Sequence, residues 1–193
     1  MQTKQNAKNM IIVISGPSGS GKTTIIEALL KRDSKLCTAI SVTTRPQRPG
    51  EINGKDYYFL SSSDFEKHLN QKEFIEHAVV YGNSYGTLKS EVQRLANQGC
   101  DIVFNKDYQG LLNLRQHHTN ILSIFIAPPS LEELEKRLRA RKQDPEDTIQ
   151  KRLAEAKKTM EEAQSYGNVI VNDDLNQCIE KVEQIIQKHR KQE

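Results

Sequence analysis

Short apolar runs separated by amphipathic stretches make up most of this chain. The runs at residues 10–15, 100–104, 121–126 and 168–171 have the length and β-branched composition of buried strands. The first run leads into a glycine-rich loop, and residues 23–31 then carry apolar side chains at helical spacing. A strand, a glycine loop and a helix are the first unit of an α/β fold. The pattern therefore predicts a central parallel sheet flanked by helices.

Helix-start signals occur in the gaps between these runs. Ser63 with Glu66, and Ser130 with Glu133, have the spacing of a capping box ahead of apolar residues. In such a box the hydroxyl accepts from a backbone N–H of the first turn, which would otherwise lack a partner. We therefore expect helices to begin at Ser63 and Ser130.

The C-terminal part reads as helix, whereas residues 41–62 do not. A long helical segment covers 147–166 and is stopped by Gly167. The last helix has an apolar stripe, formed by Ile179, Val182, Ile185 and Ile186. In residues 41–62, Thr, Arg, Pro and Gly give way to an aromatic run, which predicts a small β-rich insertion in the α/β core.

Composition fits one compact domain of 193 residues, with 36% hydrophobic and 27% charged residues. No apolar run approaches the ~20 residues needed to span a bilayer. Residues 1–9 are polar, so we expect a disordered tail without a secretory signal and a cytoplasmic protein. The net charge of +3 is too small to indicate nucleic-acid binding. We expect neither nucleic acid nor a membrane as a partner.

The three cysteines carry no recognisable site. Cys37, Cys100 and Cys178 are odd in number, far apart in sequence and outside any metal-ligand spacing. Thiols stay reduced in the cytoplasm. The sequence therefore predicts three reduced thiols.

Residues 16–23 read GPSGSGKT and satisfy the phosphate-loop pattern G-x-x-x-x-G-K-[ST] at every required position. Glycines let backbone N–H groups point at phosphate oxygens, and the following helix adds its positive end. Lys22 can reach the β- and γ-phosphates, and the Thr23 hydroxyl can ligate Mg²⁺. The predicted ATP-binding residues here are Gly16, Pro17, Ser18, Gly19, Ser20, Gly21, Lys22, Thr23 and Thr24.

A phosphate loop alone does not distinguish a GTPase switch from a phosphoryl transferase. Asp107 to Gly110 spells D-x-x-G, and Asn105-Lys106 begins an N-K-x-D element. In a GTPase these elements lie far apart and serve opposite ends of the nucleotide. Here they overlap, and Tyr108 stands where N-K-x-D requires Asp. The sequence favours a transferase.

Two further motifs, TTRPQRPGE at 43–51 and YGT at 85–87, resemble guanylate kinases together with the phosphate loop. Weaker matches lie at 53–57, 74–78, 137–141 and 171–174, and the resemblance runs from about residue 10 to 186. It implies a Mg²⁺-dependent P-loop kinase that converts ATP and GMP into ADP and GDP. The implied domain, 10–193 after the tail, comprises a core (10–40, 89–136 and 151–193), a GMP-binding insertion (41–88) and a lid (137–150).

The resemblance also implies roles for individual residues. It assigns the GMP phosphate to Ser41, Arg45, Arg48, Tyr57 and Tyr85. It assigns guanine to Glu76, Thr87 and Asp107. It places Asn172 near adenine. The implied catalytic residues, which screen the transferring phosphates, are Lys22, Arg45, Arg137, Arg141 and Arg152.

These residue types suit the chemistry. Guanidinium groups bind a dianionic phosphate bidentately. Ionised carboxylates such as Glu76 only accept hydrogen bonds, and guanine presents donors at N1 and N2, whereas adenine does not. Such a mismatch discriminates by ~10⁴ or more. No general base is required, because the attacking oxygen of GMP is already an anion at neutral pH.

One departure from the family pattern stands after the 100–104 run. The family usually has Asp-Ile-Asp there, and this chain has Asn105-Lys106-Asp107. Asn105 can still meet Mg²⁺ through a water, and we expect Lys106 to point into solvent. Two alternatives remain open: a non-catalytic guanylate-kinase-like binding module, and a P-loop kinase for another phosphorylated acceptor. The sequence also leaves open whether dGMP is used and whether the protein is a monomer or a homodimer.

Overall fold

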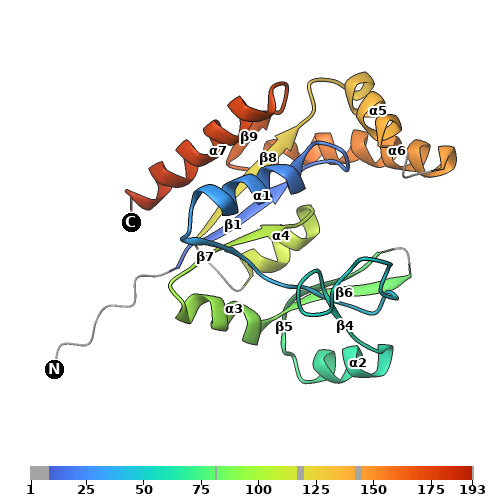
Figure 1. The fold of residues 1–193 in the computed structure, drawn as a ribbon, viewed down its shortest axis with the longest axis vertical. Helices are drawn as coiled ribbons and strands as arrows, with labels where there is room; N and C mark the ends of the chain where they lie inside the picture. The colour runs from blue at the N-terminus through green and yellow to red at the C-terminus, as the bar shows by residue number, and fades with distance from the viewer. Residues whose placement is uncertain (1–8, 81, 117–119, 142–144, 193) are drawn as a thin grey trace.

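A parallel β-sheet forms the centre of the structure, a computed structural model that describes residues 9–80, 82–116, 120–141 and 145–192. Within those residues the sheet has five strands: β1 (Ile11–Ser15), β2 (Leu36–Thr38), β7 (Asp101–Asn105), β8 (Ile121–Ala127) and β9 (Asn168–Val171). Their order is β2-β7-β1-β8-β9, and all neighbours are parallel (Figure 1). The predicted α/β class is confirmed.

The apolar runs located the four longer strands to within one residue. The exception is β2, which the pattern did not predict. It spans three residues, which is too short for a hydrophobic period to be recognised. Its place in the sheet comes from pairing with β7, where Cys37 lies opposite Ile102.

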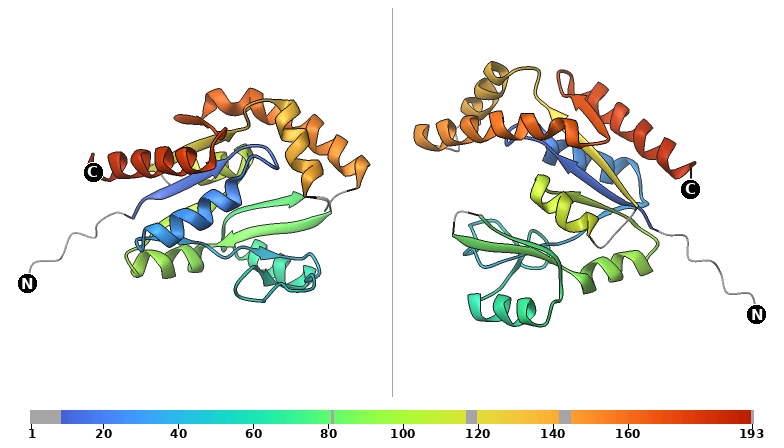
Figure 2. Two further views of the ribbon diagram at one scale, coloured as in Figure 1. Left: turned by 45° about the horizontal axis from the view of Figure 1, so that its top comes forward. Right: turned by 180° about the vertical axis from the view of Figure 1, so that it is seen from behind.

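Helices cover both faces of this sheet, because successive strand residues point to opposite sides. Ile12 and Ile14 of β1 pack with α1 (Lys22–Arg32) and α7 (Leu175–Arg190). Ile11 and Val13 pack with α3 (Lys89–Asn97), α4 (Tyr108–Arg115) and the 3₁₀ helix Glu162–Ser165. Figure 2 shows the two layers from different sides. The apolar stripe predicted for the last helix faces this core, with Val182 and Ile186 buried.

Helices α5 (Leu131–Ala140) and α6 (Glu146–Glu161) pack on each other around Leu134 and Leu138. The helix start predicted at Ser130 is confirmed, since its hydroxyl accepts from the Glu133 N–H. The start predicted at Ser63 is wrong. Ser61 caps α2 (Ser62–Asn70) instead, because its backbone is extended and its hydroxyl accepts from Asp64.

A second, smaller sheet stands apart from the first (Figure 2). It contains β3 (Val42–Thr43), β4 (Tyr58–Phe59), β5 (Phe74–Val80) and β6 (Asn83–Leu88), in the order β4-β3-β6-β5. It has its own small core, in which Val42 packs with Phe65 of α2 and with Phe74. The β-rich insertion expected near residues 41–62 is therefore present, and its sheet extends through β6.

The cysteine prediction is wrong for two of the three residues. Cys37 and Cys100 form a disulfide with a Cα–Cα distance of 5.7 Å. They are 63 residues apart in sequence, and the pairing of β2 with β7 brings them together. Cys178 is a free thiol buried in α7, and burial raises its pKa.

Two expectations concern regions outside the described residues. The disordered tail was predicted for residues 1–9, of which only Asn9 is described, and residues 142–144 of the predicted lid are not described. In the described parts of the chain, no helix combines the length and apolar character that crossing a membrane requires.

Candidate active site

The glycine-rich loop wraps closely between β1 and α1. Gly16, Gly19 and Gly21 have φ values of 137°, 93° and 97°, a region that favours glycine. A Cβ at Gly16 would lie 2.2 Å from the Ile126 carbonyl oxygen, so no side chain fits there. Because α1 begins at Lys22, the positive end of its dipole faces the loop. The arrangement is that of an anion-binding site.

Lys22 closes this loop. Its Nζ donates to the carbonyl oxygens of Gly16 at 2.7 Å and of Pro17 at 2.9 Å. Burial, with a smaller contribution from the charge of Arg141, lowers the pKa of Lys22 to about 8. A bound polyphosphate supplies negative charge and raises this pKa again. If a polyphosphate binds here, its binding above about pH 8 would therefore be coupled to proton uptake by Lys22.

Asn172 supports the loop from the end of β9. It is buried, and its Nδ2 donates to the Ser20 carbonyl at 2.7 Å. Its own carbonyl accepts from Arg137 Nη1 at 3.0 Å, so Arg137 is held against the same segment. The sequence predicted an adenine-site residue here, and the structure adds that this side chain fastens the phosphate loop.

A pocket of about 330 Å³ opens beside the loop. It is lined by Gly19, Gly21, Thr24, Arg137, Ala140, Arg141, Asn172, Asp173 and Leu175. Arg152 reaches the loop from α6, with its Nη1 3.1 Å from Ser18 Oγ. The three predicted arginines of the 137–152 region thus lie around the phosphate loop. Arg137 belongs to α5, Arg141 follows its last residue, and Arg152 belongs to α6.

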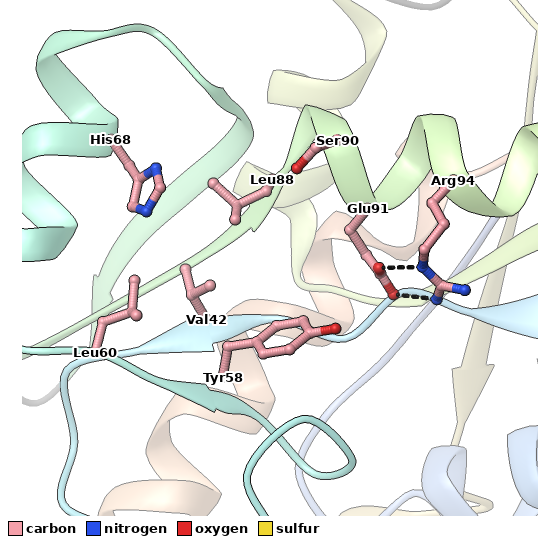
Figure 3. A pocket seen from close by; sticks show the side chains of 8 residues that line it. All are labelled: Val42, Tyr58, Leu60, His68, Leu88, Ser90, Glu91 and Arg94. Atoms are coloured by element: carbon pink, nitrogen blue, oxygen red, sulfur yellow. Dashed lines mark hydrogen bonds and ion pairs between the residues drawn. The ribbon is translucent and has the colours of Figure 1, made fainter.

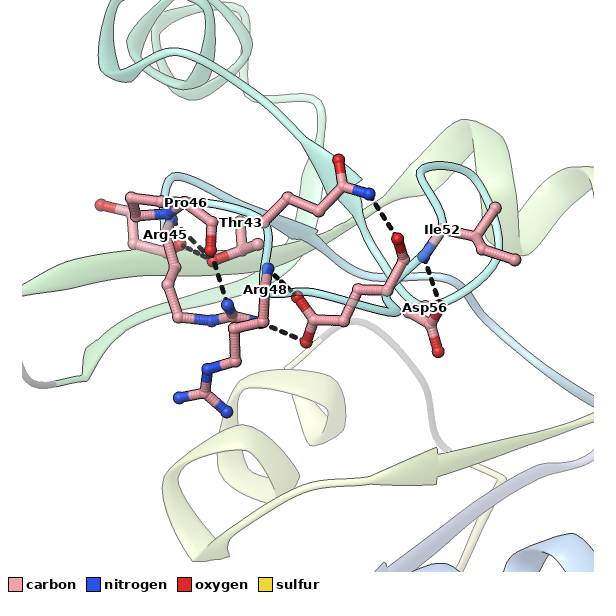
Figure 4. A network of polar contacts seen from close by, with 9 residues as sticks. Thr43, Arg45, Pro46, Arg48, Ile52 and Asp56 are labelled. Carbon is pink, nitrogen blue, oxygen red and sulfur yellow. Dashed lines mark hydrogen bonds and ion pairs between the residues drawn. The ribbon is translucent and has the colours of Figure 1, made fainter.

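A second basic site belongs to the small sheet (Figure 4). Arg45 pairs with Glu51 at 2.6 Å, and this hydrogen bond raises the pKa of Arg45, with a smaller contribution from Tyr85. The other Glu51 oxygen accepts from the Arg48 backbone N–H at 2.8 Å. The Arg48 guanidinium points away from this network (Figure 4). Tyr57 packs beside Arg45, whose guanidinium lies 5.7 Å from its ring centroid.

Next to it lies a buried polar cluster. Glu76 of β5 and Thr87 of β6 are paired across the small sheet, and Thr87 Oγ1 donates to Glu76 Oε1 at 2.7 Å. Thr87 Oγ1 also lies 3.3 Å from Ser41 Oγ. Lys106 enters from the core, with its Nζ 2.6 Å from Glu76 Oε1. Lys106 follows β7, whose last residue Asn105 lies opposite Ile14 of β1. The cluster therefore adjoins the sheet edge that carries the phosphate loop.

Comparison with known proteins places this arrangement in one family. The guanylate kinase family profile matches residues 8–189. The chain belongs to the guanylate kinase family. It is 46% identical to the guanylate kinase of Rickettsia bellii, over 95% of this chain and 96% of that protein. It is 41% identical to that of Paramagnetospirillum magneticum, over 95% and 86% respectively.

A solved structure agrees with the sequence comparison. The crystal structure of guanylate kinase from Anaplasma phagocytophilum has a TM-score of 0.72 to this chain at 31% identity. The match covers 94% of this chain and 86% of that one. Both the central sheet and the small sheet thus belong to a known guanylate kinase fold. The resemblance inferred from the sequence motifs is confirmed.

Within this family frame, the Asn105-Lys106-Asp107 segment differs from its expected arrangement. Asp107 caps α4, and its Oδ1 accepts from the Gly110 N–H at 2.8 Å. Asn105 is exposed at the end of β7. Lys106 was expected to point into solvent, and that expectation is wrong, since its side chain is 15% exposed and paired with Glu76.

Two contacts at the candidate site were not predicted. Glu51 orients Arg45, and Lys106 forms an ion pair with Glu76. Glu51 lies within the 43–51 motif, so the motif gave a signal, but its role needed the turn that brings it to Arg45. No sequence signal links Lys106 to Glu76, which is 30 residues away and in the other sheet.

Another pocket, of about 310 Å³, lies between the small sheet and α3 (Figure 3). Its lining is Val42, Tyr58, Leu60, His68, Leu88, Ser90, Glu91 and Arg94. At one side Glu91 pairs with Arg94 at 2.8 Å and accepts from the Ile40 N–H at 3.2 Å. It contains none of the predicted substrate residues. Its polar contacts join α3 to the segment that leads into the small sheet.

Proposed function

We propose that this chain transfers the γ-phosphoryl group of ATP to GMP, giving ADP and GDP, as a step of purine nucleotide metabolism in the cytoplasm. The observation that carries the proposal is the meeting of two sites at one edge of the sheet. The phosphate loop with Lys22 follows β1, and the cluster around Glu76 adjoins the end of the neighbouring β7. In-line transfer requires a donor site and an acceptor site to be held next to each other in this way.

The donor side is built for a nucleoside triphosphate. In the proposal, residues 16–24 bind the ATP phosphates, and Lys22 serves the β- and γ-phosphates. Arg137, Arg141 and Arg152, which surround the loop, screen the charge that gathers in the transition state. Asn172 shapes the adenine side of the pocket while holding Ser20.

On the acceptor side, Arg45 and Arg48 are the proposed ligands of the GMP phosphate. Arg45 is held by Glu51 and Arg48 carries a guanidinium directed away from the protein network, so both can bind phosphate with little rearrangement. Tyr57, Tyr85 and Ser41 add hydroxyl donors. Recognition of guanine falls to Glu76 and Thr87, and Asp107 has a carboxylate oxygen beyond its capping contact.

The proposed mechanism also includes closure of two segments over the nucleotides. We assign residues 41–88 as the GMP-binding insertion and 137–150 as a lid on a core of 10–40, 89–136 and 151–193. Closure over both nucleotides excludes water and so limits hydrolysis of ATP. A monomer contains every group named here, and a homodimer is equally compatible.

The residues present fit a Mg²⁺ ion carried with ATP. Among the described residues, no group of three or more His, Cys, Asp or Glu could hold a metal. Mg²⁺ in kinases is bound by few protein groups and by substrate phosphates, and the exposed Thr23 hydroxyl at the start of α1 is such a group. Mg²⁺ would neutralise phosphate charge, with Asn105 contributing through a water.

The proposed function is tested with a coupled assay of ATP against GMP, dGMP, AMP, CMP and UMP. We expect GMP to be the preferred acceptor among these five and ADP to form with it in equal amount. A folded protein that binds GMP without turnover would indicate the non-catalytic binding module. Preference for an acceptor other than GMP or dGMP would indicate a kinase of different specificity.

Replacing Asn105 by Asp tests the metal proposal. The added carboxylate charge should hold the cation more tightly, by a coulombic energy screened to roughly 1 kcal/mol in a wet cleft. We therefore expect Asn105→Asp to lower the Mg²⁺ concentration that gives half-maximal rate about fivefold at fixed ATP and GMP. Overlapping Mg²⁺ titrations for the two proteins would exclude Asn105 from the metal site.

Replacing Glu76 by Gln tests recognition of the base. The amide keeps one acceptor but introduces a donor that faces the guanine donors. We expect GMP binding to weaken by about 1.5–3 kcal/mol, as for loss of a hydrogen bond to a charged group. Calorimetry with GMP measures this, and Glu73→Gln on the exposed turn before β5 is the control. An unchanged GMP affinity in folded Glu76→Gln protein contradicts the assignment.

A further inference from the structure

Lys106 places a cation inside the site proposed for the base. Its Nζ lies 2.6 Å from Glu76 Oε1 and 3.4 Å from Ser41 Oγ. The side chains of Lys106 and Glu76 are 15% and 4% exposed. The pair is therefore largely removed from water, where charge-assisted hydrogen bonds are strongest.

This contact changes what the Glu76 carboxylate can accept. Each carboxylate oxygen has about two lone-pair sites. Thr87 Oγ1 at 2.7 Å and Lys106 Nζ at 2.6 Å both donate to Oε1 and so occupy its two sites. Guanine would need one free site on each oxygen to bind through N1–H and N2–H₂ together. Because Oε1 is occupied, Glu76 can accept a full hydrogen bond from only one of these two guanine donors, at Oε2.

The pair also presents a donor next to an acceptor. A 6-oxopurine has the carbonyl oxygen O6 beside N1–H, which is the complementary order. Adenine has an amino donor at C6 beside an N1 acceptor. An adenine base would therefore set its amino group against the Lys106 ammonium and its N1 against the Glu76 carboxylate. Two unsatisfied contacts in a buried site are costly.

We propose that Lys106 is a specificity-determining residue that donates to the C6 carbonyl of the acceptor base while Glu76 accepts from N1–H. The site then recognises the 6-oxopurine edge that guanine and hypoxanthine share. The 2-amino group is left to the exposed carboxylate of Asp107, one oxygen of which already caps α4, so it contributes little. This deepens the proposed function by naming the acceptor class, 6-oxopurine nucleoside monophosphates. It rests on the proposed assignment of this cluster to the base.

The test compares GMP, IMP and AMP as acceptors for the full-length protein and for Lys106→Met, which keeps an unbranched side chain but removes the ammonium group. For the unaltered protein we expect kcat/KM for IMP within about tenfold of that for GMP, and AMP far below both. In Lys106→Met, Oε1 regains an acceptor site and the cation is gone. The ratio of GMP to IMP should then rise about tenfold, and the ratio of GMP to AMP should fall about tenfold.

Binding of the three nucleotides without ATP, measured by calorimetry, should change in the same directions. Lys157→Met, an exposed lysine of α6, should leave all ratios unchanged. Unchanged ratios in folded Lys106→Met protein, or rejection of IMP as strong as that of AMP by the unaltered protein, would overturn the proposal. If Lys106→Met does not fold, Lys106→Gln should give the same directions with smaller changes. If GMP and IMP bind more tightly than AMP but no phosphoryl group is transferred, the proposed function is refuted and this mode of base recognition is supported.

Discussion

We expect Lys22→Met to reduce kcat with ATP and GMP by at least about 10²–10³-fold, the usual loss when one charge-stabilising donor is removed. Lys22 lies inside the phosphate loop, where it already bonds the Gly16 and Pro17 carbonyls. Its ammonium group can stabilise the negative charge that develops on the β- and γ-phosphates during transfer. GMP affinity should stay within about twofold, because the groups proposed for GMP belong to the small sheet and the end of β7.

The matched control is Lys31→Met, in the last turn of the same helix and exposed. It should retain the activity of the unaltered protein. Loss of GMP affinity in folded Lys22→Met protein would contradict the separation of donor and acceptor sites. Retention of most of the turnover would contradict the role of Lys22 itself.

A pH-dependent readout distinguishes loss of this charge from a disturbed loop. The pKa of Lys22 is about 8 in the free protein, lowered mainly by burial. The ATP phosphates raise it, so ATP binding takes up a proton between about pH 8 and the ordinary lysine value near 10.4. ATP affinity should therefore fall as pH rises through this range. Calorimetry at pH 8.5 in buffers of different ionisation enthalpy should detect the uptake in the unaltered protein and not in Lys22→Met.

The second large effect concerns stability. Reducing the Cys37–Cys100 disulfide should lower the free energy of unfolding by about 4 kcal/mol, because the bond closes a loop of about 63 residues in the unfolded chain. Urea unfolding with and without a reducing agent measures this difference. Activity should change little. Cys37 lies opposite Ile102, near the start of β7, whereas the nucleotide sites adjoin the other end of that strand.

Two variants serve as controls for this measurement. The double variant Cys37→Ser/Cys100→Ser should be insensitive to reductant, while Cys178→Ala should keep the full difference. Three free thiols titrated in the denatured, unreduced protein would contradict the prediction. In a compartment that keeps thiols reduced, the protein would have the lower stability.

The sequence by itself determined the features encoded by near neighbours along the chain. A β-branched run followed by G-x-x-x-x-G-K-T specified β1, the loop and α1, because the glycines and the helix start are local requirements. The cap at Ser130 was predictable for the same reason. The motifs at 43–51 and 85–87 identified the family, and with it the small sheet.

Only the tertiary structure decided which distant groups meet. Strand pairing brings Cys37 to Cys100, and the approach of β7 to the small sheet brings Lys106 to Glu76. Both contacts depend on strand order and register, which no local pattern specifies. Even the choice of Ser61 over Ser63 as the cap of α2 depended on the backbone, which is still extended at Ser61, two residues after β4 ends. The sequence therefore determines the chemistry available at each site, whereas the pairing of Lys106 with Glu76 is set by how the two sheets pack.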